Sequence, residues 1–159
     1  MKKIGQYTAR GTVSEQDTID GNPHQIPLFD GRFDTAYRVV EFKIWGTDYD
    51  GSANPDCIGK LSKNDDGAVA PSVFMRADDD NQIAWATTAA GGQSGTDGGF
   101  SESIIDPDNL VVEDLYVYVR SANATTTDPV NYLVILEKYE ITDWQGALAM
   151  ARDRAQGDL

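Results

Sequence analysis

Apolar and polar residues alternate over several short segments, as expected for β-strands that bury one face. The clearest segment spans residues 37–45, where Glu41 and Lys43 alternate with apolar neighbours. Residues 110–119 and 130–139 are two further strong candidates, and turn-forming residues bound all three segments. We expect one face of these strands to form the core, or the opposite face where a strand is shifted by one residue. The predicted core residues are Val40, Phe42, Ile44, Leu115, Val117, Val119, Val134 and Leu136.

Shorter segments complete the set of predicted strands, and Pro27 within one of them indicates an edge strand, because proline cannot donate to a neighbouring strand. Segments 110–119 and 130–139 are expected to be a long hairpin or a neighbouring antiparallel pair. Roughly eight short strands without helices between them predict an all-β protein, an antiparallel β-sandwich or barrel. The shorter segments are residues 7–13, 24–29, 57–61, 72–75 and 82–87.

The hydrophobic pattern changes to a helical period after residue 141. Thr142 or Asp143 is a suitable N-cap for a short amphipathic helix. We therefore expect a β-sandwich over residues 1–141, followed by a helix and tail over residues 142–159 that pack on the sandwich or dock on a neighbouring subunit. Trp144 and Leu148 are the candidate interface residues. The apolar stripe consists of Trp144, Ala147, Leu148 and Ala151.

Charge, cysteine content and hydropathy exclude several classes of function. The formal net charge of −13 argues against nonspecific binding of nucleic acid, where cations must replace counterions along the phosphates. The single cysteine, Cys57, excludes an intrachain disulfide and a cysteine zinc site, and its apolar neighbours predict a buried thiol. No apolar run suits a membrane span or a signal peptide. We therefore expect no membrane partner and a protein that is made and used without export.

Catalytic motifs are missing from the sequence. His24, the single histidine, stands between prolines in a predicted edge segment. Neither a G-x-S-x-G nucleophile elbow nor an H-E-x-x-H zinc motif occurs. Asp makes up most of the acids and favours turns, so structural capping explains most carboxylates. We therefore predict that the protein is not an enzyme.

Three acidic loops are candidate calcium sites. Asp48, Asp50 and Asp56 resemble the start of an EF-hand loop, but the glycine comes two residues early and no Glu closes the loop. Residues 78–81 and 106–109 are two further dense sources of carboxylate oxygen. Solvated turns are the simpler interpretation of all three loops. We therefore predict no cofactor, and calcium at one of these loops is the alternative.

Aromatic residues are more numerous than one face of a sandwich requires. They suit stacking platforms of a sugar-binding module, contacts between subunits of an assembly, or core packing on both faces of the strands. These residues are Trp45, Trp85, Tyr116, Tyr118 and Tyr132.

Several stretches together resemble a known group of proteins. They are residues 28–35, LFDGRFDT, before a Val-rich strand; residues 104–115, IIDPDNLVVEDL; and residues 131–139 before a helix that ends in ARDRA. In these stretches the chain is similar to small, mostly uncharacterised virion components of marine viruses and bacteriophages. The resemblance covers most of the chain and carries no catalytic signature. It implies a capsid-associated protein of jelly-roll or related sandwich type.

We therefore expect a non-enzymatic viral structural protein that forms part of a capsid shell or decorates it. Its expected partners are further copies of itself and other virion proteins, in a virion assembled in the host cytoplasm. Negative charge suits an outer location better than one that lines packaged nucleic acid. The alternative is a calcium- or carbohydrate-binding β-sandwich module.

Overall fold

The computed structural model describes ten stretches of the chain, which contain eight strands. The described stretches are residues 1–13, 23–32, 34–47, 57–65, 75–89, 100–121, 129–142, 145–146, 148–149 and 151–152. The strands are β1 (Lys2–Val13), β2 (His24–Ile26), β3 (Thr35–Gly46), β4 (Cys57–Ser62), β5 (Gln82–Ala89), β6 (Phe100–Ile105), β7 (Leu115–Ser121) and β8 (Val130–Glu140).

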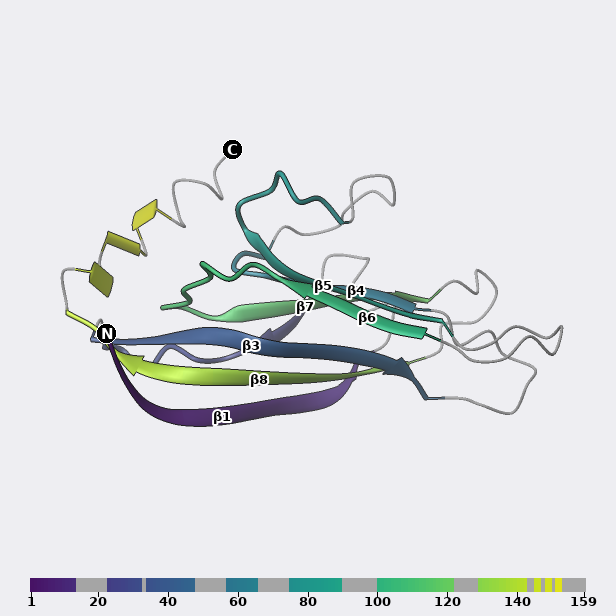
Figure 1. The fold of residues 1–159 in the computed structure, drawn as a ribbon, viewed down its shortest axis with the longest axis horizontal. Coiled ribbons are helices and arrows are strands. Elements are labelled where there is room, and N and C mark those ends of the chain that lie inside the picture. Colours follow the sequence, from purple (N-terminus) through teal and green to yellow (C-terminus); the bar gives the residue numbers. More distant parts are fainter. Residues whose placement is uncertain are drawn as a thin grey trace, which may run out of the picture.

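These strands form two antiparallel sheets that pack against each other (Figure 1). One sheet has three strands in the order β1-β8-β3, and the other has five in the order β2-β7-β4-β5-β6. The arrangement confirms the predicted all-β antiparallel sandwich, whereas the jelly-roll type stays a prediction. Strand β2 lies at a sheet edge and ends directly before Pro27, as the proline predicted.

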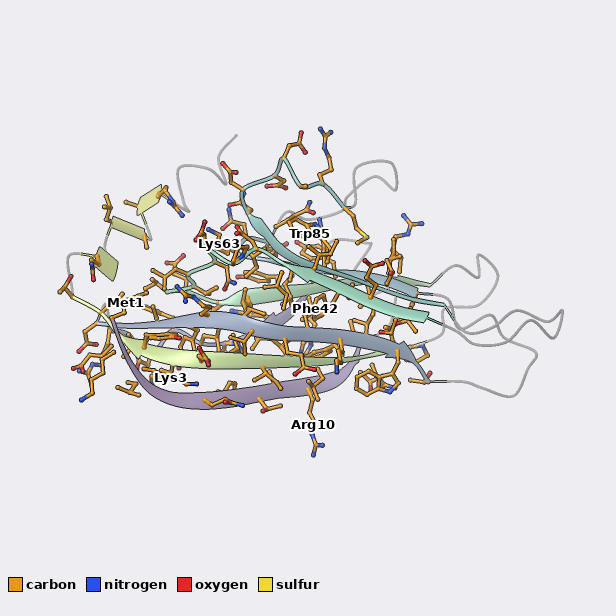
Figure 2. The ribbon with its side chains drawn as sticks, viewed as in Figure 1. Met1, Lys3, Arg10, Phe42, Lys63 and Trp85 are labelled. Carbon is orange, nitrogen blue, oxygen red and sulfur yellow. The ribbon has the colours of Figure 1, made fainter. Side chains whose placement is uncertain are left out.

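The inner faces of the two sheets form one continuous hydrophobic core. Phe42 is fully buried and lies between the sheets (Figure 2). The alternation of the sequence therefore identified the correct face for most of the core. Seven predicted core residues are buried: Phe42, Ile44, Leu115, Val117, Val119, Val134 and Leu136.

Val40 is the exception, because a β-bulge interrupts the alternation of β3. The register with β8 shifts between Val39, which lies opposite Leu136, and Glu41, which lies opposite Ile135. Val40 has no partner across the ladder and is 40% exposed, while Val39 is 2% exposed and takes its place in the core. A bulge adds one residue to one strand, so the residues on either side of it change face.

The prediction that segments 110–119 and 130–139 pair with each other is wrong. Strand β7 pairs with β2 and β4, whereas β8 pairs with β1 and β3 in the other sheet. Both strands have one apolar face, and the two faces meet across the sandwich core instead of lying side by side. The regular strand β7 also begins only at Leu115, and Val111 before it forms an isolated bridge with Tyr37.

Strand β6 was not predicted. It pairs with β5 at the edge of the larger sheet, and residues 101–104 are all exposed. Because neither face of this short strand is fully buried, its sequence shows no apolar alternation. Of the predicted strand at residues 72–75, positions 72–74 lie outside the described residues.

Residues 145–146, 148–149 and 151–152 are helical, which confirms the predicted change of period. The Thr142 hydroxyl accepts a hydrogen bond from the Gln145 backbone N–H, and the Gln145 side chain accepts one from the Thr142 N–H, both at 3.3 Å. This reciprocal pair is a capping box, which identifies Thr142 as the N-cap. Within the described part of the chain, no helix is long and apolar enough to cross a membrane.

The orientation of the helix differs from the predicted stripe. Ala149 packs against a second small cluster built from Ala36, Val112 and Ile141. Leu148 is 54% exposed, and Ala151 is exposed as well. The described helical residues thus contact the sandwich through Ala149, and Leu148 is left on the surface.

Candidate functional site

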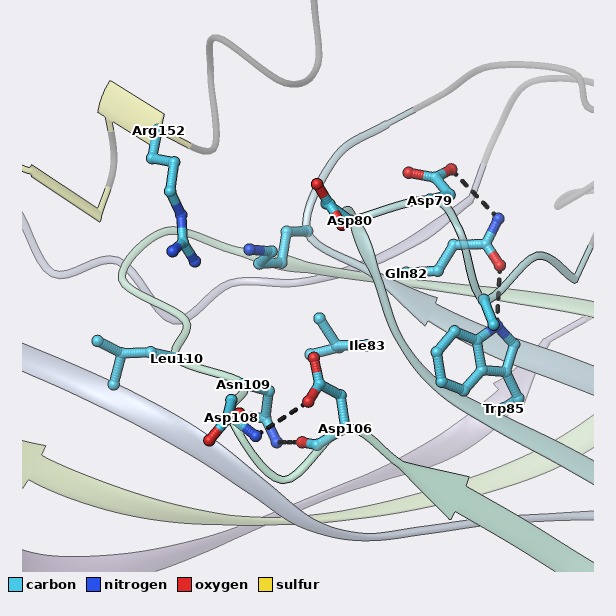
Figure 3. Close-up of a pocket in the computed structure, with 12 residues that line it drawn as sticks. Asp79, Asp80, Gln82, Ile83, Trp85, Asp106, Asp108, Asn109, Leu110 and Arg152 are labelled. Atoms are coloured by element: carbon cyan, nitrogen blue, oxygen red, sulfur yellow. Dashed lines mark hydrogen bonds between the residues drawn. The ribbon is translucent and has the colours of Figure 1, made fainter.

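Two of the acidic turns meet at one pocket. The pocket has a volume of about 450 Å³ and lies at the end of the larger sheet, where residues 77–85 and 106–110 come together (Figure 3). The sequence showed both turns as dense in carboxylates but gave no sign that they are neighbours. The residues that line the pocket are Lys63, Ala77, Asp79, Asp80, Gln82, Ile83, Trp85, Asp106, Asp108, Asn109, Leu110 and Arg152.

Two of these aspartates also hold their own turns. The carboxylate of Asp79 accepts a hydrogen bond from the backbone N–H of Asn81 at 3.0 Å, and that of Asp106 accepts one from Asp108 at 3.0 Å. Such Asp side chains replace a backbone acceptor inside a turn. The carboxylates that line this pocket are therefore partly explained by local structure.

Trp85 is held in the pocket wall by its polar neighbours. The indole N–H donates to Gln82 Oε1 at 2.9 Å, and the Gln82 amide donates to Asp79 at 3.3 Å (Figure 3). The backbone N–H of Arg76 also donates to Gln82 Oε1 at 2.8 Å. Because Gln82 is only 3% exposed, this small network fixes the position of the half-buried indole.

The pocket contains both signs of charge. Four aspartates and two cations line it: Lys63 is 7% exposed, and Arg152 reaches the pocket from the C-terminal helical residues (Figure 3). Within the described stretches, no group of three or more His, Cys, Asp or Glu side chains is arranged to hold a metal ion. The sequence gave no signal for Lys63, Gln82 or Arg152, because their proximity depends on how the two sheets and the helix pack.

The other sequence candidates lie in different places. Asp48, Asp50, Asp56 and Trp144 fall outside the described residues, so their predicted roles stay predictions. His24 is exposed at the edge of the larger sheet, and its ring centroid lies 5.4 Å from that of Tyr132.

Cys57 is 4% exposed and contributes to the core, which confirms the predicted buried thiol.

The aromatic residues divide between the core and the surface. Tyr132 is 3% exposed, and burial raises the pKa of its phenol. Tyr118 is fully buried and lies under Lys60, whose Nζ is 4.6 Å from the ring centroid. Trp85 and Tyr116 are half-buried, and Trp45 is 37% exposed. Core packing therefore explains some of these residues, and Trp45 needs another explanation.

A second candidate site is the outer face of the three-stranded sheet. The register places Trp45 beside Asn131 and Glu41 beside Ile135, and these four side chains point away from the core. The half-buried Ile135 and Leu133 of the central strand form an apolar line, which Trp45 and the bulged Val40 flank at 37% and 40% exposure. We call Val40, Trp45, Leu133 and Ile135 the apolar strip.

A charged cluster closes one end of this face. Glu137 accepts hydrogen bonds from Lys3 and from the Tyr139 hydroxyl. The hydrogen bond from Lys3, followed by the one from Tyr139, lowers the pKa of the Glu137 carboxyl. The same contact with Glu137 raises the pKa of Tyr139. Arg38 adds a cation 5.5 Å from the Tyr139 ring centroid.

Comparison with known proteins finds no match to this chain among family models, curated proteins or solved structures. The pocket and the outer face of the three-stranded sheet are therefore the two features of the described structure that bear on function.

Proposed function

We propose that this protein is a non-enzymatic structural subunit of a virus particle, part of the capsid shell or a decoration on it. The observation that carries the proposal is the apolar strip, where large apolar side chains are displayed on a regular sheet. Protein interfaces combine an apolar or aromatic centre with a polar rim. The viral setting rests on the resemblance of residues 28–35, 104–115 and 131–139 to virion components.

The surroundings of the strip match this pattern. Register places Arg10 and Lys43 on either side of Leu133, and Thr8 and Glu41 on either side of Ile135. The centre is therefore apolar while both neighbouring strands contribute polar and charged groups. Because the strip is carried by strands instead of loops, it offers a preformed surface that loses little conformational entropy on binding.

Size-exclusion chromatography with light scattering over a concentration series tests the proposal. We expect the purified chain to associate, and we expect Trp45→Ser to weaken association by about tenfold or more, since aromatic residues dominate interface energy. Phe29→Ser is the matched control, because Phe29 is 39% exposed but lies outside the strip. A chain that stays monomeric up to about 1 mM would contradict the proposal.

The pocket favours a second candidate function, a calcium- or carbohydrate-binding module. Trp85 with nearby carboxylates and amides is a combination that suits polyhydroxylated ligands, since the ring offers an apolar face beside polar groups. Melting curves with calcium, with a chelator and with a panel of simple sugars separate this candidate from the first. A rise in melting temperature with either ligand that Trp85→Ala abolishes would support it.

A further inference from the structure

We propose that copies of this chain pair edge to edge, with β1 of one copy adding to β6 of the next. This inference rests on the proposed self-association and identifies a second contact for it. The partner that binds at the β1 edge is thus a second copy of the same chain. It binds through its β6, an extended strand whose charge is opposite to that of β1.

The fold has four edge strands, and two of them offer little room for a partner. Strand β2 has only three residues. Strand β3 is covered by the other sheet: Tyr37 exchanges backbone hydrogen bonds of 2.7 and 2.8 Å with Val111, and the Ile44 carbonyl accepts one from the Thr88 hydroxyl at 2.6 Å. Asn109 occupies the same edge at Val39.

Among the described residues, no further strand pairs with the outer side of the other two edges, β1 and β6. Strand β1 has twelve residues, of which eight are exposed, and its described hydrogen bonds run to β8 on one side only. Ile4 and Tyr7 on this strand are 48% and 49% exposed. Strand β6 pairs only with β5, and Ile104 on it is 59% exposed. A long edge with unpaired backbone groups is a template for another strand.

Charge distinguishes the two open edges. The charged residues of β1 are all cations, Lys2, Lys3 and Arg10, in a chain of net charge −13. Lys3 is already bound to Glu137, whereas the exposed Arg10 points away from the molecule (Figure 2). The charged residue of β6 is Glu102, which is exposed. The two edges are therefore complementary.

The same charges oppose pairing of like edges. Two β1 strands paired antiparallel about their midpoint would bring Lys2 and Lys3, near the start of one strand, close to Arg10 of the other copy. Two β6 strands would bring their Glu102 residues together. Like charges directly opposite across a strand pair are destabilising, and opposite charges are stabilising. Pairing of β1 with β6 is thus favoured over either symmetric pairing.

One antiparallel register satisfies both charge and side-chain direction. With Glu102 opposite Arg10, Ile104 falls opposite Thr8 and Ile105 opposite Tyr7. Arg10, Thr8, Glu102 and Ile104 all point to the outer faces of their sheets, and Ile105 points to the inner face, where it packs on the core. Each outer face is therefore continued by the outer face of the next copy.

Such a contact joins two different surfaces, so one copy keeps an open β6 and the other keeps an open β1. Contacts of this kind propagate into a ring or an open filament, depending on the rotation between copies. Together with the apolar strip, a subunit then has two independent contacts, which a shell or a lattice requires.

Charge reversal on the full chain tests the pairing. We expect Arg10→Glu and Glu102→Arg each to weaken association by about tenfold or more, and the double variant to restore it, because the pair is again opposite in sign. Arg32→Glu is the control for net charge, since Arg32 is an exposed loop cation outside both edges. Added salt should weaken association of the wild type. Hydrogen exchange should slow in both β1 and β6 at high protein concentration.

The outcomes separate this pairing from the broader proposal. If the wild type associates and neither reversal changes its size distribution, the edge pairing is wrong while self-association stands. If both single variants dissociate but the double variant does not recover, the edges matter without being partners, and the pairing is again overturned. Rescue cannot come from a role of Arg10 beside the strip, because Glu102 lies in the other sheet. A wild type that stays monomeric would contradict both the proposed self-association and the β1–β6 pairing.

Discussion

The side-chain amide of Asn109 binds both backbone groups of Val39. Its oxygen accepts a hydrogen bond from the Val39 N–H at 2.8 Å, and its nitrogen donates to the Val39 carbonyl at 3.1 Å. The same nitrogen donates to the carbonyl of Asp106 at 2.6 Å. Asn109 is 3% exposed, and Val39, which it binds, comes directly before the bulge residue Val40. The Asn109 side chain therefore supplies the hydrogen-bond acceptor and donor that a neighbouring strand would supply to the Val39 backbone.

Asn109→Ala should lower the free energy of unfolding by about 2–4 kcal/mol, because it leaves a buried N–H and a buried carbonyl of Val39 without partners. Urea titration measures the change. Asn131→Ala is the control, since Asn131 is half-buried on the outer face and bonds only to the exposed Thr12 hydroxyl among its described contacts. Equal losses in the two variants would show that the Asn109 contacts contribute little.

Phe42→Ala should lower the free energy of unfolding by about 3–5 kcal/mol, since the ring is fully buried and its removal leaves a cavity. Val40→Ala should cost less than about 1 kcal/mol, because the bulge leaves Val40 at 40% exposure. Denaturant titration of both variants measures the difference. A large loss at Val40 would show that the bulge is misplaced.

Gly11→Ala should destabilise the protein by about 1–3 kcal/mol. A Cβ at Gly11 would lie 3.0 Å from the Tyr132 ring and hydroxyl, and the buried ring has to move to accept it. Gly5→Ala in the same strand is the matched control, because a Cβ there meets nothing within 4 Å. That variant should be neutral or more stable, since alanine restricts the unfolded chain. Thermal melts that rank the two variants in reverse order would contradict this account.

The Glu137 carboxylate should stabilise the fold in a pH-dependent way. Its pKa is lowered in the folded state, first by the hydrogen bond from Lys3, so its contribution is present above the unfolded pKa and is lost as pH falls through the folded pKa. The stability difference between wild type and Glu137→Gln should therefore be constant near neutral pH and shrink below about pH 4.5, the ordinary value. Urea titrations at several pH values measure it. A difference between the two proteins that does not change with pH would contradict this account.

Trp144 remains a predicted anchor between subunits. We expect Trp144→Ala to dissociate the assembly while the strands stay folded, because aromatic residues concentrate interface energy. Light scattering follows the assembly and circular dichroism follows the strands. If the variant stays assembled at concentrations near the dissociation range of the wild type, Trp144 is not an anchor between subunits. Leu148→Ala, at a position 54% exposed, tests the neighbouring candidate in the same way.

The sequence predicted the strands that bury one face and missed the features set by pairing between distant residues. Phe42 lies between Glu41 and Lys43, so its face could be predicted from local pattern alone. The bulge at Val40 depends on the register between β3 and β8, which no local window contains. The placement of β7 and β8 in different sheets is likewise a property of the whole fold.

The pocket illustrates the same limit for function. The acidic turns at residues 78–81 and 106–109 were recognised from composition, but their proximity follows from the path of β5 and β6. The sequence places Lys63 in a turn, where an exposed side chain is expected, whereas Lys63 is buried in the fold. The capping box of Thr142 and Gln145 was easier to anticipate, because both partners lie within one turn of chain.

The position of β8 has a consequence for how the chain acquires its structure during synthesis. Strand β8 is the last strand and lies in the middle of its sheet, with the first strand on one side and β3 on the other. Strands β4, β5, β6 and β7 can pair among themselves once residue 121 has left the ribosome. β1 and β3 have no sheet to join until residues 130–140 follow them out. Because pairing of β1 with β8 closes a long loop, β1 stays unpaired until the intervening strands and β8 have been made, and binding of β1 by a chaperone or by another chain competes with its own folding.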